Sequence, residues 1–223
     1  MLRVSLTLLA AFGIVAVQSG ALPSRASPAP QHNVTYASPR SIRAAALQER
    51  QAHAERSLYT YPASLQQRYR NNEHGFSVRY PQGWKAQEMK QENYGKLSSI
   101  ILFLSPLEGE KDISRENINL VIEELPPSPQ TLEGYTAAAI ALEQELFDEY
   151  TITASHDLQI AGLSAHRITY TAAMNGGSTT AFEQIWFLRD GKAYVWSLAA
   201  LPDSYDRYAQ TFRLMLDSLS FRK

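Results

Sequence analysis

Residues 151–200 constrain the fold of this chain more than any other stretch. They hold four strand-like segments, at 151–160, 164–173, 180–189 and 192–200, separated by the breaks "AGL", "NGGS" and "DG". Short breaks that contain glycine, above all Asn-Gly and Asp-Gly, are the strongest sequence signals for tight β-hairpins. The stretch therefore predicts an antiparallel meander of four strands.

The last two of these segments are apolar on both faces. In the third, Phe182 and Trp186 point to one side while Ile185 and Phe187 point to the other, and the fourth segment repeats the pattern. A strand with two apolar faces is buried on both sides and lies in the middle of a sheet. The chain must therefore supply cover for each face of the sheet.

Two segments have the periodicity of covering helices. The first runs from a Thr131 cap to about residue 147, and the second from Asp203 or Ser204 to about residue 219. In each, apolar side chains recur at spacings of three and four, which forms one stripe along a helix. The stripes consist of Leu132, Tyr135, Ala139, Leu142 and Leu146, and of Tyr205, Tyr208, Phe212, Met215 and Leu219.

Further strands precede the first helix. Residues 76–80 alternate like a strand, Pro81 and Gly83 break it, and 85–88 resume pairing. Residues 99–104 form a short apolar run, and 117–123 alternate again. The predicted fold is α+β, with an antiparallel sheet of about six or seven strands and helices on both faces, an α/β/α sandwich.

The N-terminal region predicts export from the cytoplasm. A short basic start, an apolar segment at 4–17 and small residues at 19–21 have the order of a Sec-type signal peptide. The apolar run is shorter than the roughly 20 residues of a membrane span, although an uncleaved anchor is the alternative. We predict a signal peptide at 1–21, a linker rich in Pro, Ser and Ala at 22–70 with a helix-forming stretch, and a domain at 71–223.

Charge and cysteine content narrow the function classes. Residues 1–70 carry eight Lys or Arg against two acids, +6, and the remainder carries −7, so the net charge of −1 excludes a globally basic nucleic-acid binder. The chain has no cysteine. Disulfides, thiolate metal sites and cysteine nucleophiles are therefore excluded.

The sequence contains no Gly-rich phosphate loop and no G-x-S-x-G elbow. The weak candidates for a metal or acid–base site are His156, Asp157 and His166, which flank the first turn of the meander. Their spacing matches no metal motif, and ordinary surface histidines are the alternative. We predict no catalytic residue and no cofactor-binding residue.

Two other groups have both a functional and a structural interpretation. One group is the set of acids Glu108, Glu110, Asp112 and Glu116, whose oxygens are potential calcium ligands. Their spacing lacks the regularly placed Asp and Asn residues and the glycine of a calcium-binding loop, so a solvated loop is favoured. The three tryptophans, at 84, 186 and 196, are interpreted as core residues rather than as a ligand platform.

Several motifs occur in an order that resembles a known family. They are "GFSVRYPQGWK", "NINLVIEELP", "TLEGY", "GLSAHRITYT", "FEQIWFLRDGKAYVWSLAALPDSYD" and a closing helix that ends in "SLSF". Together they resemble the PsbP-like family, which includes the photosystem II extrinsic subunit PsbP, bacterial PsbP-related proteins and DcrB-type periplasmic proteins. The resemblance spans residues 74–223.

The resemblance implies an α/β/α sandwich and a protein that is not an enzyme. It implies an exported binding or assembly module that docks peripherally on a membrane protein complex, photosystem II if the host is phototrophic, in a periplasm or thylakoid lumen. Calcium is implied only by the family, and no metal ligand carries over. The alternative from the residues themselves is a periplasmic small-ligand-binding protein or weak hydrolase with a cleft near His156 and His166.

Overall fold

The structure of the protein is a computed structural model. It describes residues 65–89, 93–94, 97–107, 115–128, 130–173 and 177–222. The predicted signal peptide and the linker as far as residue 64 lie outside the described residues.

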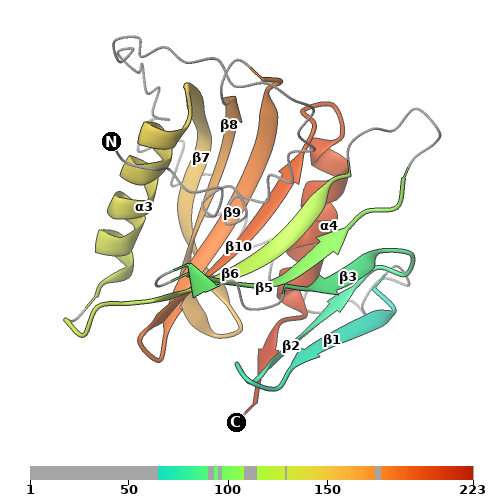
Figure 1. Cartoon of the computed structure of the whole chain (residues 1–223), viewed down its shortest axis with the longest axis horizontal. Helices are drawn as coiled ribbons and strands as arrows, with labels where there is room; N and C mark the ends of the chain where they lie inside the picture. Colours follow the sequence, from blue (N-terminus) through green and yellow to red (C-terminus); the bar gives the residue numbers. More distant parts are fainter. Residues whose placement is uncertain are drawn as a thin grey trace.

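A large antiparallel sheet forms the centre of the molecule (Figure 1). Its strands follow the order β3-β5-β6-β10-β9-β8-β7, and β4 pairs with β5 outside that path. Their bounds are β3 Lys85–Glu88, β4 Asn93–Tyr94, β5 Leu97–Leu104, β6 Asn117–Glu124, β7 Glu149–Ile160, β8 Leu163–Ala173, β9 Thr180–Arg189 and β10 Lys192–Ala200. The predicted meander is confirmed, because β7, β8, β9 and β10 are consecutive neighbours in the sheet.

Two of the meander's turns have the backbone geometry that tight hairpins need. Ala161 and Gly162 have φ angles of 50° and 80°, and Asp190 and Gly191 have φ angles of 51° and 72°. Positive φ at both central residues is the mark of the type I′ turn, whose twist matches that of the flanking strands. The "NGGS" turn includes residues 175 and 176, which lie outside the described residues.

A second, three-stranded sheet in the order β1-β2-β11 corrects three strand predictions. Its strands are β1 Gln67–Asn71, β2 Phe76–Tyr80 and β11 Ser220–Phe221. Strand β2 pairs with β1 and β11 and does not join the large sheet. Strand β1 lies in residues that were expected to belong to the linker. The sequence shows little sign of a strand there, because Tyr69 is the one buried apolar residue of β1. Residues 220–221 were expected to close a helix but form a strand.

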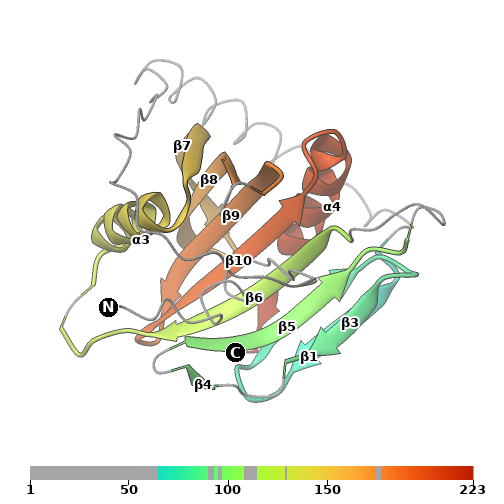
Figure 2. The same ribbon diagram turned by 45° about the horizontal axis from the view of Figure 1, so that its top comes forward.

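The two predicted helices exist and lie on opposite faces of the large sheet (Figures 1 and 2). Helix α3, Leu132–Leu146, begins at Thr131, whose hydroxyl accepts a hydrogen bond from the Gly134 N–H. Helix α4 is Tyr205–Asp217, and its N-cap residue, Ser204, makes no side-chain cap. No helix among the described residues is both long and apolar enough to cross a membrane.

Two apolar cores follow from this layering. On one face, α3 packs on Phe182, Trp186 and Ile168 of the large sheet. On the other, α4 and the small sheet together cover a larger core that includes Trp196 and Phe187. The α+β class and the cover on both faces are as predicted.

The break after β2 is a structural corner. Pro81 is buried, Gly83 has a φ of 88°, and the Trp84 N–H donates to the Pro81 carbonyl at 3.4 Å. The Trp84 ring packs against the Tyr208 ring of α4, with the two ring centroids 5.9 Å apart. The corner therefore carries the chain from the small sheet to β3 of the large sheet and is fixed there by an aromatic contact.

Candidate functional site

The β7–β8 hairpin brings together only part of the predicted His156, Asp157 and His166 cluster. The His166 Nδ1 lies 2.6 Å from the Asp157 Oδ1. His156 pairs in register with Arg167, and a β-bulge between Ile152 and Ala154 shifts the alternation of β7. The bulge lies beyond His156 from the turn, so plain alternation decides the faces: adjacent strand residues point to opposite sides, and Asp157 pairs with His166. His156 is therefore buried on the α4 face while His166 stacks on Trp186 on the α3 face. The three side chains do not converge.

Ser155 takes the place that the sequence suggested for His156. Its Oγ lies 3.0 Å from the His166 Nε2. Because the Asp157 carboxylate accepts from Nδ1, a neutral His166 has Nε2 free to accept the Ser155 proton. Burial lowers the pKa of His166, and its hydrogen bond to Asp157 opposes that effect. The row Ser155–His166–Asp157 therefore has the hydrogen-bond order of a nucleophile, a base and an orienting acid.

The surroundings of this row differ from those of an enclosed catalytic site. The Asp157 side chain is 82 % exposed, and it lies on β7, the last strand of the sheet. Neither described pocket is lined by Ser155 or His166. No group of three or more metal-ligating side chains forms among the described residues.

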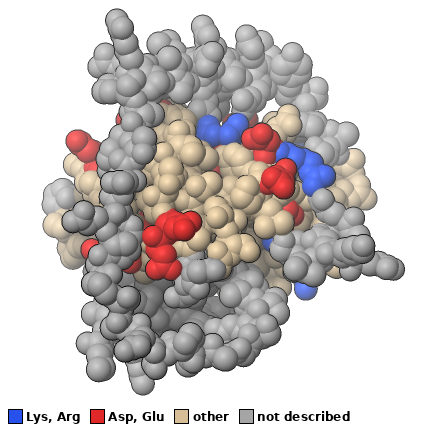
Figure 3. All heavy atoms as spheres, turned by 90° about the horizontal axis from the view of Figure 1, so that it is seen from above, with Lys and Arg blue, Asp and Glu red and all other residues tan. Residues whose placement is uncertain are grey.

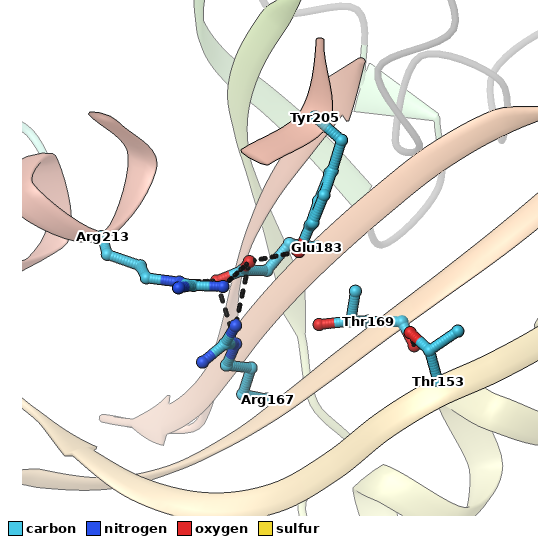
Figure 4. Close-up of polar contacts among 6 residues, drawn as sticks. All are labelled: Thr153, Arg167, Thr169, Glu183, Tyr205 and Arg213. Atoms are coloured by element: carbon cyan, nitrogen blue, oxygen red, sulfur yellow. Dashed lines mark hydrogen bonds and ion pairs between the residues drawn. The ribbon is translucent and has the colours of Figure 1, made fainter. Parts of the chain in front are cut away.

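On the opposite face, Glu183 of β9 binds two arginines (Figure 4). Arg167 of β8 and Arg213 of α4 each approach both carboxylate oxygens, at 2.9 to 3.1 Å. The Tyr205 hydroxyl donates to the same carboxylate at 2.6 Å. Glu183 is fully buried, so this cluster satisfies a charge inside the protein and ties α4 to the sheet.

The predicted calcium acids are only partly described. Glu108, Glu110 and Asp112 lie outside the described residues. Glu116 is buried and accepts hydrogen bonds from the Ser105 Oγ at 3.1 Å and the Ser204 Oγ at 2.6 Å. These bonds join the loop before β6 to the start of α4, which is a structural role.

A pocket of about 300 Å³ opens between α3 and strands β5, β6, β9 and β10. Most of its wall is apolar, from Leu97, Val121, Leu142, Trp186 and Val195 among others. Its polar wall residues include Glu123, Gln184 and Glu143. A largely apolar concavity with a few polar groups is the usual form of a small-molecule site.

Glu143 is a buried acid that the sequence did not indicate. It is 2 % exposed, whereas Leu142, which was expected in the buried stripe, is 45 % exposed. The Tyr150 hydroxyl donates to Glu143 at 2.5 Å and the Tyr170 hydroxyl at 3.5 Å. Burial raises the pKa of Glu143 to about 8, and the two tyrosine hydrogen bonds oppose the shift. Glu143 is therefore mostly protonated at neutral pH.

Exposed arginines gather on the outer face of the small sheet. We call the set Arg68, Arg70, Ser77, Ser220 and Arg222 the arginine face; with the edges of two phenylalanines it lines a hollow of about 180 Å³. The register explains the cluster, because Arg70 pairs with Ser77 and Ser77 pairs with Ser220. The two serine hydroxyls are 3.1 Å apart. Among the residues that the structure describes, none that lines this hollow is acidic.

Another end of the molecule has a different charge pattern. In the view from above Figure 1, basic side chains lie beside acidic ones in one part of the surface, and another acidic group stands without a basic neighbour in view (Figure 3). The small sheet lies at the lower part of Figure 1, beside the C terminus.

Sequence reasoning missed both surfaces for physical reasons. The arginine face depends on pairing of β2 with the mostly polar neighbouring strand β1 and with the short strand β11, which is far away in the sequence. The pocket depends on the exact phase of α3. The signals available were the Arg-x-Arg spacing of 68 and 70 and the polar Gln184 inside an apolar strand.

Comparisons with known proteins agree with one another on the fold. A family model described as PsbP-like protein matches residues 42–221. The solution structure of cyanobacterial PsbP (CyanoP) from Synechocystis sp. PCC 6803 matches with a TM-score of 0.54 and 18% identity, over 74% of this chain and 99% of that one. The Ran-binding protein Mog1p from Saccharomyces cerevisiae matches with a TM-score of 0.50 and 11% identity, over 70% and 94%. No curated protein sequence matches.

The Glu183 cluster leads to a stability prediction. Glu183→Gln leaves Arg167 buried without its counter-charge, so we expect the free energy of unfolding to fall by about 3 to 5 kcal/mol. Urea denaturation measures the change. Glu124→Gln is the matched control, because Glu124 is exposed where it pairs with Lys192, and we expect a loss under about 1 kcal/mol there. Equal losses in the two variants would contradict the assigned role of Glu183.

Glu143 leads to a prediction about pH. Its carboxyl has a folded pKa of about 8 against an ordinary value of 4.5, so ionisation favours the unfolded chain between these values. Its contribution to stability is complete below about pH 4.5, is lost as pH rises to about 8, and is constant above that. We expect the Tm of Glu143→Gln, measured at several pH values, to lack this fall. Parallel Tm curves for the two proteins would contradict the raised pKa.

Proposed function

The chain belongs to the PsbP-like family, and from that premise we propose that it is a non-catalytic binding module that docks on a membrane protein complex. The proposed docking surface is the arginine face of the small sheet. If the host is phototrophic, photosystem II is the complex that we propose. The protein associates with the membrane peripherally, through this complex rather than by a span of its own.

The arginine face is the observation that carries this proposal. Arg68 and Arg70 are exposed on β1, one beside Arg79 and the other beside Ser77 in the register of β2. Arg222 adds a third guanidinium to the hollow and donates to the Asn72 side chain at 2.5 Å. Guanidinium groups bind carboxylates through paired N–H groups, so the surface suits an acidic protein segment.

The charge balance of the chain supports the choice of this face. Residues 71–223 carry a net charge of −7, and the hollow of the arginine face is basic. A surface opposite in sign to the rest of its domain orients the molecule during encounter, since an acidic partner repels the remainder. We propose that this orientation selects the docking geometry.

We propose that docking takes place outside the cytoplasm, in a periplasm or thylakoid lumen. The support is the N-terminal sequence, with its basic start, apolar segment at 4–17 and small residues at 19–21. A protein delivered to that side of a membrane meets the extramembrane surfaces of membrane complexes there. Family membership adds support, because PsbP-like proteins are generally non-catalytic.

The docking proposal predicts the effect of charge reversal. We expect full-length Arg68→Glu/Arg70→Glu protein to lose, by tenfold or more, its recovery of a defined complex from mild-detergent extracts of its host's membranes. The control Lys85→Glu/Arg207→Glu changes net charge equally on other exposed positions and should retain recovery. Raising the salt concentration should weaken the wild-type interaction, because exposed charges are screened beyond about 8 Å at physiological ionic strength.

Three outcomes would contradict the docking proposal. The first is that no membrane complex accompanies the wild-type protein. The second is an equal loss in the charge-reversal variant and its control. The third is equal binding to protein-free vesicles made from the lipids of those membranes, which would make anionic headgroups the partner.

A second candidate function is weak ester hydrolysis at Ser155. The observation that favours it is the Ser155–His166–Asp157 row, with contacts of 3.0 Å and 2.6 Å. His166 would take the Ser155 proton as the oxygen attacks the ester carbon and would give it to the departing alcohol as the ester C–O bond breaks; water would then release the acid from Ser155. Against it stands the exposure of Asp157, since water around that carboxylate weakens its hold on the ring.

A fluorophosphonate probe decides between the two functions. The binding-module proposal expects no labelling of the wild-type protein above that of Ser155→Ala, measured by intact-protein mass spectrometry. Labelling that is abolished by Ser155→Ala and reduced by His166→Gln would establish a reactive serine instead. Asp157→Asn would then show whether the exposed acid contributes.

A further inference from the structure

The pocket beneath α3 contains a buried hydrogen-bond donor that the fold does not use. Gln184 of β9 lines the pocket and is 1 % exposed. Its Nε2 has no hydrogen-bond partner among the described residues. Leaving a buried polar group without a partner costs roughly 1 to 3 kcal/mol, so such a group in a pocket wall indicates a ligand that completes it.

A neighbouring side chain, that of Ser197, is also buried without a hydrogen-bond partner among the described residues. Ser197 of β10 pairs with Gln184 in the register, which places the two side chains on the same face of the sheet. Ser197 is fully buried, and its Oγ also has no partner in the described part of the chain. Gln184 in the pocket wall and Ser197 beside it thus place two unpartnered polar groups next to each other on the face beneath α3.

The charges around the pocket restrict what it can accept. The lining residues described by the structure include no lysine, arginine or histidine. The two acids that line it are Glu143, which remains protonated up to about pH 8, and Glu123, which accepts from the Tyr135 hydroxyl at 2.9 Å. A carboxylate or phosphate would enter without a counter-charge and close to Glu123, so the ligand is not an anion.

We propose that the pocket between α3 and the large sheet binds a small, uncharged and mostly apolar molecule whose carbonyl oxygen accepts a hydrogen bond from the Gln184 Nε2. The apolar wall, with Trp186 and Val195, takes the hydrocarbon part. The ligand is an aromatic or alicyclic ketone, quinone or amide rather than a fatty acid. This inference is independent of the docking proposal, because the pocket and the arginine face lie on opposite sides of the large sheet.

The size of the pocket sets the size of the ligand. Its volume of about 300 Å³ lies at the lower end of the range for small-molecule sites. A bicyclic ring with a short side chain fits, whereas a large pigment or a whole lipid does not. The exposed Leu142 and Ala138 of α3 stand at the pocket wall and provide positions from which to test it.

The test is equilibrium dialysis of the full chain against methyl naphthyl ketone and against ethylnaphthalene with the same substitution. The two probes share the carbon skeleton and differ in the carbonyl oxygen, so only the ketone accepts a hydrogen bond. We expect saturable binding of the ketone, and a roughly three- to tenfold weaker affinity in Gln184→Leu. Ethylnaphthalene should bind Gln184→Leu at least as well as the wild type, since leucine replaces an unpartnered amide.

Two substitutions on α3 test the location. Ala138→Trp places an indole at an exposed position on the pocket wall and should abolish binding of both probes. Ala137→Trp is the matched control, because Ala137 is exposed on the same helix and does not line the pocket. The Tm of every variant is measured, and we expect Gln184→Leu to be no less stable than the wild type.

Each contrary result overturns a stated part of the inference. Absence of saturable ketone binding to the folded wild-type protein would overturn the site itself. Ketone binding that survives in Ala138→Trp would place it elsewhere in the molecule. If Gln184→Leu weakened the binding of both probes equally, the proposed hydrogen bond between Gln184 and the ligand's carbonyl oxygen would be wrong.

Discussion

The burial of β9 and β10 on both faces is the constraint on which the rest of the structure depends. Trp186 and Phe187 are adjacent in the sequence, and both are fully buried on opposite sides of the sheet. No two-layer arrangement hides both, so the chain must supply a cover on each side. Helix α3 is one cover, and α4 with the small sheet is the other. Glu183 strengthens the requirement, because its buried charge needs Arg213 from α4.

The two covers give the two sides of the sheet different properties. The inner face of the small sheet contributes Phe76 and Val78 to the core. Its outer face is not buried and can therefore carry arginines. Helix α3 is a single helix over a wide sheet, packed mainly against β7, β8 and β9. The incomplete cover leaves a recess towards β5 and β6, and polar groups such as Gln184 remain in its floor. One charged surface and one apolar recess are the consequence of this asymmetry.

Much of the fold follows from alternation and turn chemistry, because burial and turns leave local marks in the sequence. The bounds of β2, β3, β9 and β10 match their predicted ranges. Pairing between distant or polar segments leaves no such mark, so β1, β11 and the separate small sheet could not be foreseen. In the site, the contact between Asp157 and His166 was predictable from the hairpin. Alternation along β7 also places His156 on the face opposite to Asp157, which grouping the three residues overlooked. The burial of Glu143 in place of Leu142 was not predictable, because it depends on the exact phase of α3.

The small sheet also links binding competence to the completion of folding. Ser77 and Ser220 are 143 residues apart, and the pairing of their strands closes a loop that contains the large sheet and α4. Contacts between such distant residues form slowly, because a long loop must close before they gain anything. Arg68 and Arg70 lie on the local hairpin of β1 and β2, and Ser220 and Arg222 join them through this closure, which completes the arginine face. A partner that needs the complete face therefore binds the finished fold in preference to a chain in which β11 is unpaired.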